Sequence, residues 1–357
     1  MSTLNLRDAK LIENWYIAAL STDVTEHKPF ACTLYDEPLV IFREASGTPK
    51  TLQDRCIHRG TKLSKGHCSK VGITCPYHGW TFGSEGEVIS IPSEGPENDK
   101  LSTRSQNKAW KVQAYPTVEQ DGVIWVWMGR GEPKTAAPPW RFPYFGDKKW
   151  TQYFMVTDFE NEVGHLVQNF MDVPHTVFVH DKWFREKKWM NVPYDLETSQ
   201  GRVKATYHKP LDTIGGFMNR VINPDRKPME HIDEFIYPNI TRVDYRFGSR
   251  GFVINSQCSP VSEFKTRVYT WITYRGSFIA PMLKPLMRYY TRKVITQDVE
   301  IMQNQGSNLQ RFKDAPVWVS TAADEIHIAI ERLRTQGQMG KFETQATASN
   351  KERSFWI

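Results

Sequence analysis

Short apolar runs alternate with polar, turn-forming residues over the first third of the chain. Strand-like runs lie at residues 36–44, 72–74, 80–82, 88–91 and 123–127. Gly, Pro, Ser and Asn, which favour turns, separate these runs. The pattern predicts that the first third of the chain is all β.

A Pro-rich stretch interrupts the pattern at residues 129–146. Proline lacks a backbone N–H donor and biases the residue before it toward extended backbone, so regular structure is disfavoured there. We therefore expect a first domain at residues 1–130, a linker at 131–146 and a second domain at 147–335.

The second domain combines helical and strand-like patterns. Residues 158–179 and 281–310 carry apolar side chains at helical intervals. Between them, residues 251–275 are strand-like and broken at Ser259-Pro260. A domain of class α+β is the expected result.

Neither end of the chain carries a long apolar segment. Residues 1–8 contain no signal-like apolar core, and no uncharged apolar stretch approaches the roughly 18 residues that a membrane span needs. We expect a cytoplasmic protein without a membrane span. Residues 335–353 are polar and aperiodic, which predicts a loosely held C-terminal tail over residues 336–357.

Composition is that of a globular protein of two ordinary domains. Of 357 residues, 39% are hydrophobic, 24% are charged and 13% are aromatic. The net charge of +6 arises from 46 basic and 40 acidic residues that are interleaved, so we expect no nucleic-acid partner. The five cysteines are too few and too scattered for a disulfide framework.

Two short segments each combine one cysteine with one histidine. Cys56 and His58 form a C-x-H motif, and Cys75 and His78 form a C-x₂-H motif. This set suits a [2Fe–2S] cluster in which Cys56 and Cys75 bind one iron and His58 and His78 bind the other. A zinc site is the alternative, but zinc modules usually pair like ligands at each end.

The segment from about residue 14 to residue 129 resembles the Rieske domain of the ring-hydroxylating oxygenase family. The resemblance lies in the residues Arg59-Gly60, Leu63, Gly66, Cys75-Pro-Tyr-His-Gly-Trp80 and Gly122-Val-Ile-Trp-Val-Trp127. It implies an N-terminal all-β Rieske domain followed by a helix-grip-type α+β catalytic domain with a mononuclear iron.

A second group of candidate ligands follows the predicted domain boundary. His175 and His180, joined by a distant carboxylate, would form the two-histidine, one-carboxylate set that binds Fe(II) on one face. The segment also resembles the family motif N-x₂-D-x₂-H-x₄-H. The resemblance implies Asp298 as the third ligand, with Glu300 as the rival on another helix face. Both acids could instead be solvated helix charges.

Two further residues of this motif are candidates for catalysis. By resemblance, Asp172 would bridge His175 or His180 to His78 of another subunit, which makes a homo-oligomer, with a trimer favoured, part of the mechanism. Asn169 either hydrogen-bonds near the iron or caps local backbone.

Electrons must reach the chain from a separate protein, because the sequence has no Gly-rich dinucleotide fingerprint. We expect NAD(P)H to supply them through a reductase, a ferredoxin or both. A basic group around the predicted cluster loops could steer an acidic donor, or could meet acids across a subunit interface. The group comprises Arg55, Arg59, Lys62, Lys65 and Lys70.

The predicted function is that of a terminal oxygenase that activates O₂ and hydroxylates or oxidatively demethylates a hydrophobic, aromatic small molecule. A Rieske electron-transfer protein without oxygenase activity is the main alternative, and a zinc-binding interaction protein is another. The sequence does not choose between insertion of one or two oxygen atoms. Pocket candidates, none assigned to substrate, are Phe184, Phe217, Met218, Phe235, Tyr237, Phe247, Phe252 and Trp271.

Overall fold

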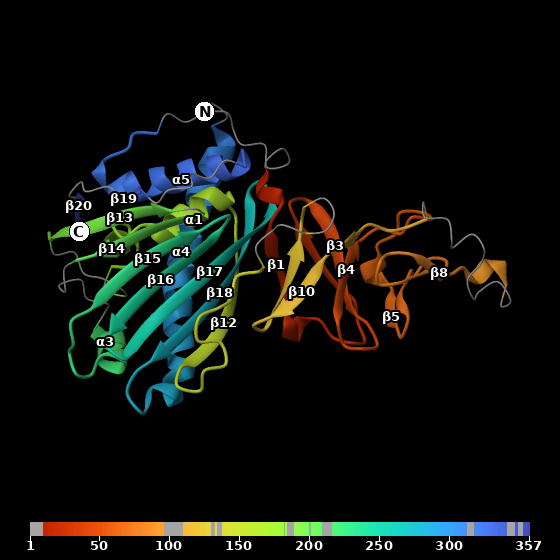
Figure 1. Cartoon of the computed structure of the whole chain (residues 1–357), viewed down its shortest axis with the longest axis horizontal. Helices are drawn as coiled ribbons and strands as arrows, with labels where there is room; N and C mark the ends of the chain where they lie inside the picture. The colour runs from red at the N-terminus through yellow and green to blue at the C-terminus, as the bar shows by residue number, and fades with distance from the viewer. Residues whose placement is uncertain are drawn as a thin grey trace. The chain divides into compact units, whose positions relative to one another are not determined.

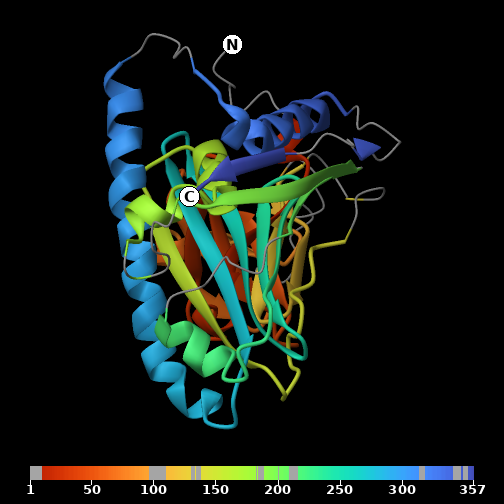
Figure 2. The ribbon, with the colours of Figure 1, turned by 90° about the vertical axis from the view of Figure 1, so that its left-hand side faces the viewer.

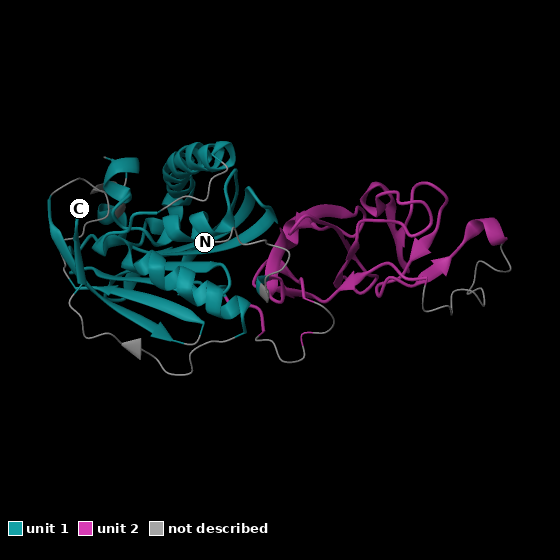
Figure 3. Ribbon diagram, turned by 90° about the horizontal axis from the view of Figure 1, so that it is seen from above, with its two compact units in different colours: residues 1–11, 142–357 teal, residues 12–141 magenta. Residues whose placement is uncertain are grey.

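The computed structural model of the chain contains two compact units, one of residues 12–141 and one of residues 1–11 with 142–357 (Figure 3). Each unit has a hydrophobic core of its own. The residues that the structure describes are 10–95, 110–129, 133, 138–181, 183, 189–199, 201–208, 216–312, 318–340, 347–348 and 353–357.

The unit of residues 12–141 is all β, as predicted. Within its described residues the sheets have the orders β1-β11-β10, β2-β3-β4-β9 and β5-β6-β7-β8. Its short 3-10 turns are η2 (Ser21–Asp23), η3 (Leu63–Lys65) and η4 (Pro92–Glu94), and η1 (Lys10–Ile12) ends at the first residue of the unit. The strands are β1 (Trp15–Leu20), β2 (Phe30–Leu34), β3 (Glu37–Arg43), β4 (Pro49–Gln53), β5 (His67–Ser69), β6 (Gly72–Thr74), β7 (Thr81–Phe82), β8 (Val88–Ser90), β9 (Ala114–Tyr115), β10 (Thr117–Gln120) and β11 (Val123–Trp127).

Local sequence explains the central strand of this unit. Every residue of β11 is buried, because the strand lies between β1 and β10. Asp121 and Gly122 form the two-residue connection from β10 to β11, with φ angles of 52° and 77°. Positive φ at both positions is the geometry of a hairpin turn that Asp-Gly favours. The predicted strand at residues 123–127 is therefore confirmed.

The unit of residues 142–357 is α+β, as predicted, and consists of an antiparallel sheet with helices against it (Figures 1 and 2). Its described strands have the order β12-β18-β17-β16-β15-β14-β13-β19, and β20 also pairs with β13. They are β12 (Thr151–Phe159), β13 (Asn191–Ser199), β14 (Arg202–Tyr207), β15 (Glu230–Ile236), β16 (Ile240–Phe247), β17 (Arg250–Ser262), β18 (Lys265–Arg275), β19 (Thr347–Ala348) and β20 (Arg353–Trp356).

The helices of this unit supply the layer that faces the sheet. They are α1 (Val163–Met171), α2 (Thr176–Val179), α3 (Gly216–Ile222), α4 (Lys284–Arg311) and α5 (Glu325–Gln338), with 3-10 turns η5 (Ala280–Leu283) and η6 (Ala322–Asp324). In α1, Val163, Leu166, Val167 and Met171 are buried at helical spacing. The long helix α4 runs beside β12 (Figure 2). No helix among the described residues is long and apolar enough to cross a membrane.

The predicted strand break at Ser259-Pro260 is wrong. β17 continues through Pro260 and ends at Ser262, and the chain then reverses into β18. The pairing of β17 with β16 ends at Gln257, so the missing N–H of Pro260 falls where only β18 is a partner strand. A register irregularity follows between Pro260 and Ser262. Proline is tolerated in strands at such unpaired edges and bulges.

The C-terminal end differs from the loosely held tail expected over residues 336–357. Arg353–Trp356 forms β20 against β13. Phe355 and Ile357 are buried in the same core as α1 and α5, while Ser354 and Trp356 are exposed. Exposed and buried side chains thus alternate over residues 354–357, as in a strand. The run is too short to be recognised in the sequence beside the polar segment that precedes it.

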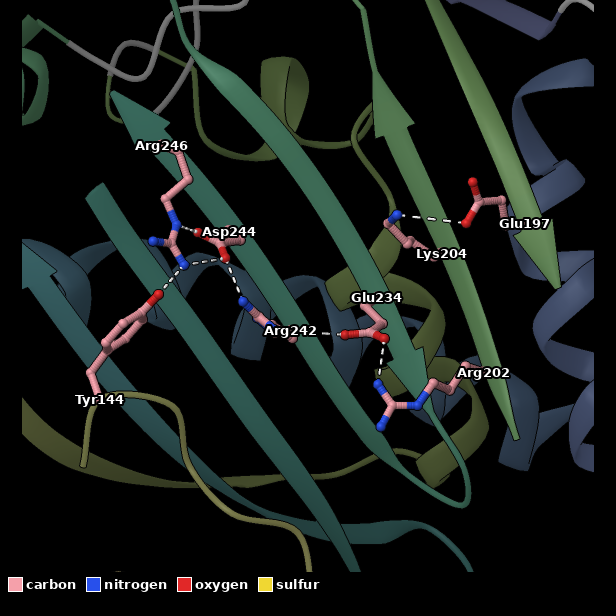
Figure 4. A network of polar contacts seen from close by, with 8 residues as sticks. All are labelled: Tyr144, Glu197, Arg202, Lys204, Glu234, Arg242, Asp244 and Arg246. Atoms are coloured by element: carbon pink, nitrogen blue, oxygen red, sulfur yellow. Dashed lines mark hydrogen bonds and ion pairs between the residues drawn. The ribbon is translucent and has the colours of Figure 1, made fainter. Parts of the chain in front are cut away.

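Charged side chains form a ladder across strands β13 to β16 (Figure 4). Asp244 accepts hydrogen bonds from Arg242 at 2.6 Å and from Arg246 at 2.5 Å. Glu234 accepts one from Arg202 at 2.7 Å. Because successive side chains of a strand point to opposite faces, Glu234 and Asp244 lie on the face opposite their neighbours Asp233 and Val243.

Candidate metal centres

Two loops of the β unit close in the same way. In the first, Cys56 N–H donates to the carbonyl of Thr61 and Gly60 N–H donates to the carbonyl of Cys56, each at 2.8 Å. In the second, Cys75 N–H donates to the carbonyl of Trp80 at 2.8 Å and Gly79 N–H to the carbonyl of Cys75 at 3.2 Å. Both glycines have positive φ, 76° and 73°, a conformation that favours glycine. The sequence therefore builds two matching tight loops.

The loops bring the two cysteines together in the core and the two histidines together at its edge. Cys56 and Cys75 are 2% and 3% exposed, and each thiol lies close enough to hydrogen-bond the other. Burial raises the pKa of the Cys56 thiol, although the backbone N–H of His58 counteracts this. The rings of His58 and His78 are 4.6 Å apart between centroids, and His78 is exposed.

These four residues fit a [2Fe–2S] cluster. Nδ1 of His58 is buried and has no hydrogen-bond partner among the described residues, which suits an atom that binds a metal. A bound iron would also favour the thiolate over the buried thiol. Trp80 stacks on the ring of His58 at 4.7 Å with an interplanar angle of 10° and so fixes that ring's plane.

The second group of candidate ligands comes from two helices of the α+β unit. His175 and His180 flank the short helix α2, and Asp298 lies on α4. Asp172, which follows α1, accepts a hydrogen bond from the backbone N–H of His175 at 3.3 Å and so fixes the start of α2. The structure thus unites residues that are 118 or more positions apart in the sequence.

The three side chains converge on a small volume. Oδ1 of Asp298 lies 3.5 Å from Nε2 of His175 and 3.2 Å from Nε2 of His180. A first-row metal holds N and O ligands about 2.1 Å away, so ligands at right angles lie about 3 Å apart. One donor atom from each of His175, His180 and Asp298 lies within 4.8 Å of the others. The donor set and its spacing therefore fit one metal ion.

Protonation equilibria at this group also favour a positive charge between the side chains. Burial alone would raise the pKa of Asp298, but hydrogen bonds from His175 and His180 outweigh it and hold that pKa well below its usual range. Burial alone would lower the pKa of His175, but Asp298 and Asp172 outweigh it and raise that pKa. A metal cation would take the place of the proton that this arrangement stabilises.

Other polar residues orient these side chains. Asn169, on α1, donates a hydrogen bond to Oδ1 of Asp298 at 3.0 Å, so it contacts the candidate iron site. Asp172 Oδ2 lies 3.9 Å from Nδ1 of His175. Glu300 is exposed, whereas Asp298 is 4% exposed.

Gln297 was not foreseen from the sequence. Its Oε1 lies 3.0 Å from Nδ1 of His180 and can accept a hydrogen bond from that nitrogen, which leaves Nε2 available to bind a metal ion. The sequence offers one indication of its role, its position directly before Asp298. This indication is useful only once Asp298 is known as a candidate iron ligand.

A cavity of about 130 Å³ adjoins His175, His180 and Asp298. Of the aromatic candidates, Phe252 lines this cavity. Phe235 and Phe247 belong to the two cores instead, and Trp271 packs among Phe142, Phe145 and Phe154. Phe184 and the side chains of Phe217 and Met218 lie outside the described residues.

The fold and the two groups of ligands define a class of protein: one with a Rieske-type β domain and a mononuclear metal site in an α+β domain. Comparison with family models agrees. Residues 14–116 match the Rieske [2Fe-2S] domain, and residues 159–336 match the vanillate O-demethylase oxygenase C-terminal domain. The chain belongs to the Rieske non-haem iron oxygenases.

Individual relatives are more distant. Phenoxybenzoate dioxygenase subunit alpha of Ectopseudomonas oleovorans is 30% identical over 247 residues, 64% of this chain and 55% of the relative. The oxygenase component of dicamba O-demethylase of Stenotrophomonas maltophilia is 30% identical over 224 residues, 60% and 61% of the two chains. The match thus spans little more than half of each relative.

A solved structure shares the fold over nearly the whole chain. Dicamba monooxygenase bound to dicamba has a TM-score of 0.75, and the match covers 93% of this chain and 98% of that one. At 19% sequence identity, this similarity concerns the fold alone.

Proposed function

We propose that the chain is the terminal oxygenase of a Rieske-type mono- or dioxygenase system. It takes electrons from a separate reductase or ferredoxin, ultimately from NAD(P)H, and uses O₂ to hydroxylate or oxidatively demethylate a hydrophobic, aromatic molecule. One observation carries the proposal: two histidines and a carboxylate with metal-ligand spacing lie beside a largely apolar cavity, in a chain that also holds a Rieske domain.

In the proposed site, His175, His180 and Asp298 are the ligands of a mononuclear Fe(II). When bound, the iron supplies the O₂ chemistry at coordination positions that these ligands leave open. Asn169 and Gln297 restrict the orientations of Asp298 and His180 through the hydrogen bonds given above. The lining of the cavity is mostly apolar, which suits a hydrophobic substrate.

The β domain is proposed to receive the electrons. Cys56, Cys75, His58 and His78 would hold the [2Fe–2S] cluster. His78 is exposed, so the histidine side of the cluster can meet a partner protein. The five basic residues of these loops, Arg55, Arg59, Lys62, Lys65 and Lys70, are all exposed and could steer an acidic donor.

Asp172 is proposed to link the two centres of neighbouring subunits. Its side chain is 26% exposed and lies beside His175. A carboxylate in this position can accept a hydrogen bond from His175 and another from His78 of a second copy. We therefore propose a homo-oligomer, with a trimer favoured, as the working unit. The cytoplasmic location expected from the sequence stays a prediction.

Metal analysis combined with electron paramagnetic resonance tests the proposed function. We expect about three irons per chain, two in the cluster and one mononuclear, together with a reduced Rieske signal. About two irons with the same signal would indicate an electron carrier without an oxygenase site. Zinc in place of iron would contradict both functions.

A further inference from the structure

A buried carboxylate lies on the floor of the cavity, on the sheet and not on the helices that carry the candidate iron ligands. Asp233, on β15, pairs across the strands with Val243 of β16, which pairs with Ile254 of β17 and that residue with Ile272 of β18. All four line the cavity. Asp233 is 2% exposed and continues a row of aliphatic side chains.

Two residues on the same face of the sheet, beside Asp233, hold this carboxylate in place. Tyr207 donates its hydroxyl to Oδ2 of Asp233 at 3.1 Å, and Nε2 of His231 lies 2.9 Å from Oδ1. The ring of His231 is stacked between Tyr207 and Tyr245, at 4.3 and 4.4 Å between centroids. Each carboxylate oxygen can accept more than one hydrogen bond, so Asp233 keeps acceptor capacity toward the cavity.

The described lining of the cavity holds acidic side chains but no permanently cationic ones. Among the described residues that line it, none is Lys or Arg. The other ionised or imidazole groups of the lining, Asp172, His175, His180 and Asp298, all belong to the candidate iron site. An anionic ligand group at the sheet side would therefore meet the carboxylate of Asp233, and the basic side chain nearest to it, His231, already contacts that carboxylate and does not line the cavity. A donor group there would meet an oriented acceptor.

Asp233 and Asp298 come from different sides of the fold. Asp298 lies on α4, which packs beside β12, at one end of the sheet (Figure 2). Asp233 lies on β15, in the sheet, so the two carboxylates enter the same cavity from different layers of the fold. Asp233 is thus available to a group of a bound molecule that faces the sheet.

We propose that Asp233 determines substrate class by accepting a hydrogen bond from an N–H or O–H group of the substrate. The substrate is then a hydrophobic molecule with a neutral or cationic donor at its sheet-facing end, and not one with a carboxylate there. This inference rests on the proposed function, in which the cavity is the substrate site. Tyr207 and His231 act as positioning residues for Asp233.

The physical basis is the cost of an unpaired polar group. A site built to form a hydrogen bond rejects a ligand that lacks the partner group, because the buried acceptor is then left unsatisfied. Like charges placed together in an apolar enclosure add further discrimination. Both effects favour benzylamine and benzyl alcohol over benzoate, although the three probes share a ring and nearly the same size.

Calorimetric titration of the iron-loaded protein with these three probes tests the inference. We expect benzylamine and benzyl alcohol to bind at least about tenfold more tightly than benzoate. In Asp233→Asn this ratio should fall at least about tenfold, since the amide is neutral and the same size. Tyr207→Phe, which removes one hydrogen bond to Asp233, should lower the ratio less. Glu234→Gln, on the opposite face of the same strand, is the matched control and should leave it unchanged.

Two results would overturn the inference. One is an unchanged ratio of probe affinities in folded, iron-loaded Asp233→Asn. The other is wild-type protein that binds benzoate as tightly as benzylamine and benzyl alcohol. If Asp233→Asn does not fold, the inference is tested by the affinity ratio of the wild-type protein and by its decrease in Tyr207→Phe. The iron content of the same samples is a separate readout: wild-type protein that cannot hold the mononuclear iron contradicts the proposed function, whatever the probes do.

Discussion

The two candidate metal centres contrast in how the fold encloses them. The cysteine and histidine loops lie between short strands, and His78 and Tyr77 at their tips are exposed. His180 and Asp298 are 3% and 4% exposed and adjoin a cavity. The difference matches the proposed division of labour: electrons must enter from a partner at the surface, whereas the proposed O₂ chemistry takes place at buried ligands beside a largely apolar cavity.

The two centres also differ in what positions their ligands. In the loops, backbone hydrogen bonds and two glycines with positive φ fix Cys56 and Cys75. In the buried site, side chains orient the ligands: Asn169 donates a hydrogen bond to Asp298, and Gln297 accepts one from His180. Substitutions of side chains should therefore separate the two centres.

The largest effect is expected from Asp298→Ala. Loss of this ligand should remove the mononuclear iron and lower turnover at least about 1000-fold, because no other group supplies the metal's chemistry. The Rieske signal should persist. Glu300→Ala, an exposed acid two residues along the same helix, is the matched control for iron content and turnover. If Glu300→Ala lost the mononuclear iron and Asp298→Ala kept it, Glu300 and not Asp298 would be the third ligand.

A smaller effect is expected from Asp172→Asn. The variant should keep both metal centres but lose about 10- to 100-fold in turnover, as substitutions of groups that orient ligands do. The decisive measurement is the rate at which the reduced cluster is reoxidised by O₂ in the presence of substrate. A normal rate in this variant would exclude Asp172 from the electron route between subunits.

Gln297→Ala should weaken the mononuclear site without abolishing it. Nδ1 of His180 loses its acceptor, so we expect roughly tenfold lower affinity for iron, measured by competition with a chelator. Gln303→Ala, an exposed glutamine of the same helix, provides the comparison. Equal affinities in the two variants would show that the hydrogen bond to His180 does not orient the ligand.

Trp80→Leu is expected to have the smallest effect and to act on the other centre. Removing the ring that stacks on His58 should lower the free energy of unfolding of the β unit by about 1 kcal/mol for the aromatic pair alone, and the lost packing against Trp110 and the core adds to this. Thermal unfolding followed by the visible absorbance of the cluster measures this. A loss of mononuclear iron in this variant would mean that the two centres are not separable.

Local sequence was enough to predict one centre but not the other. Each loop places Cys and His within four residues, so Cys56, His58, Cys75 and His78 could be proposed from spacing alone. Asp298 lies far from His180 along the chain, and only resemblance to a family pointed to it. The structure then distinguishes it from Glu300 by burial.

The cavity floor could not be predicted at all. Asp233, His231 and Tyr207 meet because β14 and β15 pair in a particular register, with Tyr207 opposite His231. Periodicity indicates strands but does not fix which residues of two strands face each other. For the same reason, the list of aromatic pocket candidates captured core residues such as Phe235 and Phe247 and, among lining residues, only Phe252.

The central claim is that one chain holds both an electron-receiving cluster and a separate mononuclear iron, which His175, His180 and Asp298 would bind beside the cavity. Spectra of reduced wild-type protein and His175→Ala, each exposed to nitric oxide, test it directly. Both proteins should show the signal of the reduced cluster, and wild type alone should show a high-spin iron–nitrosyl signal. Absence of the nitrosyl signal from iron-loaded wild type, or its persistence in His175→Ala, would contradict the account.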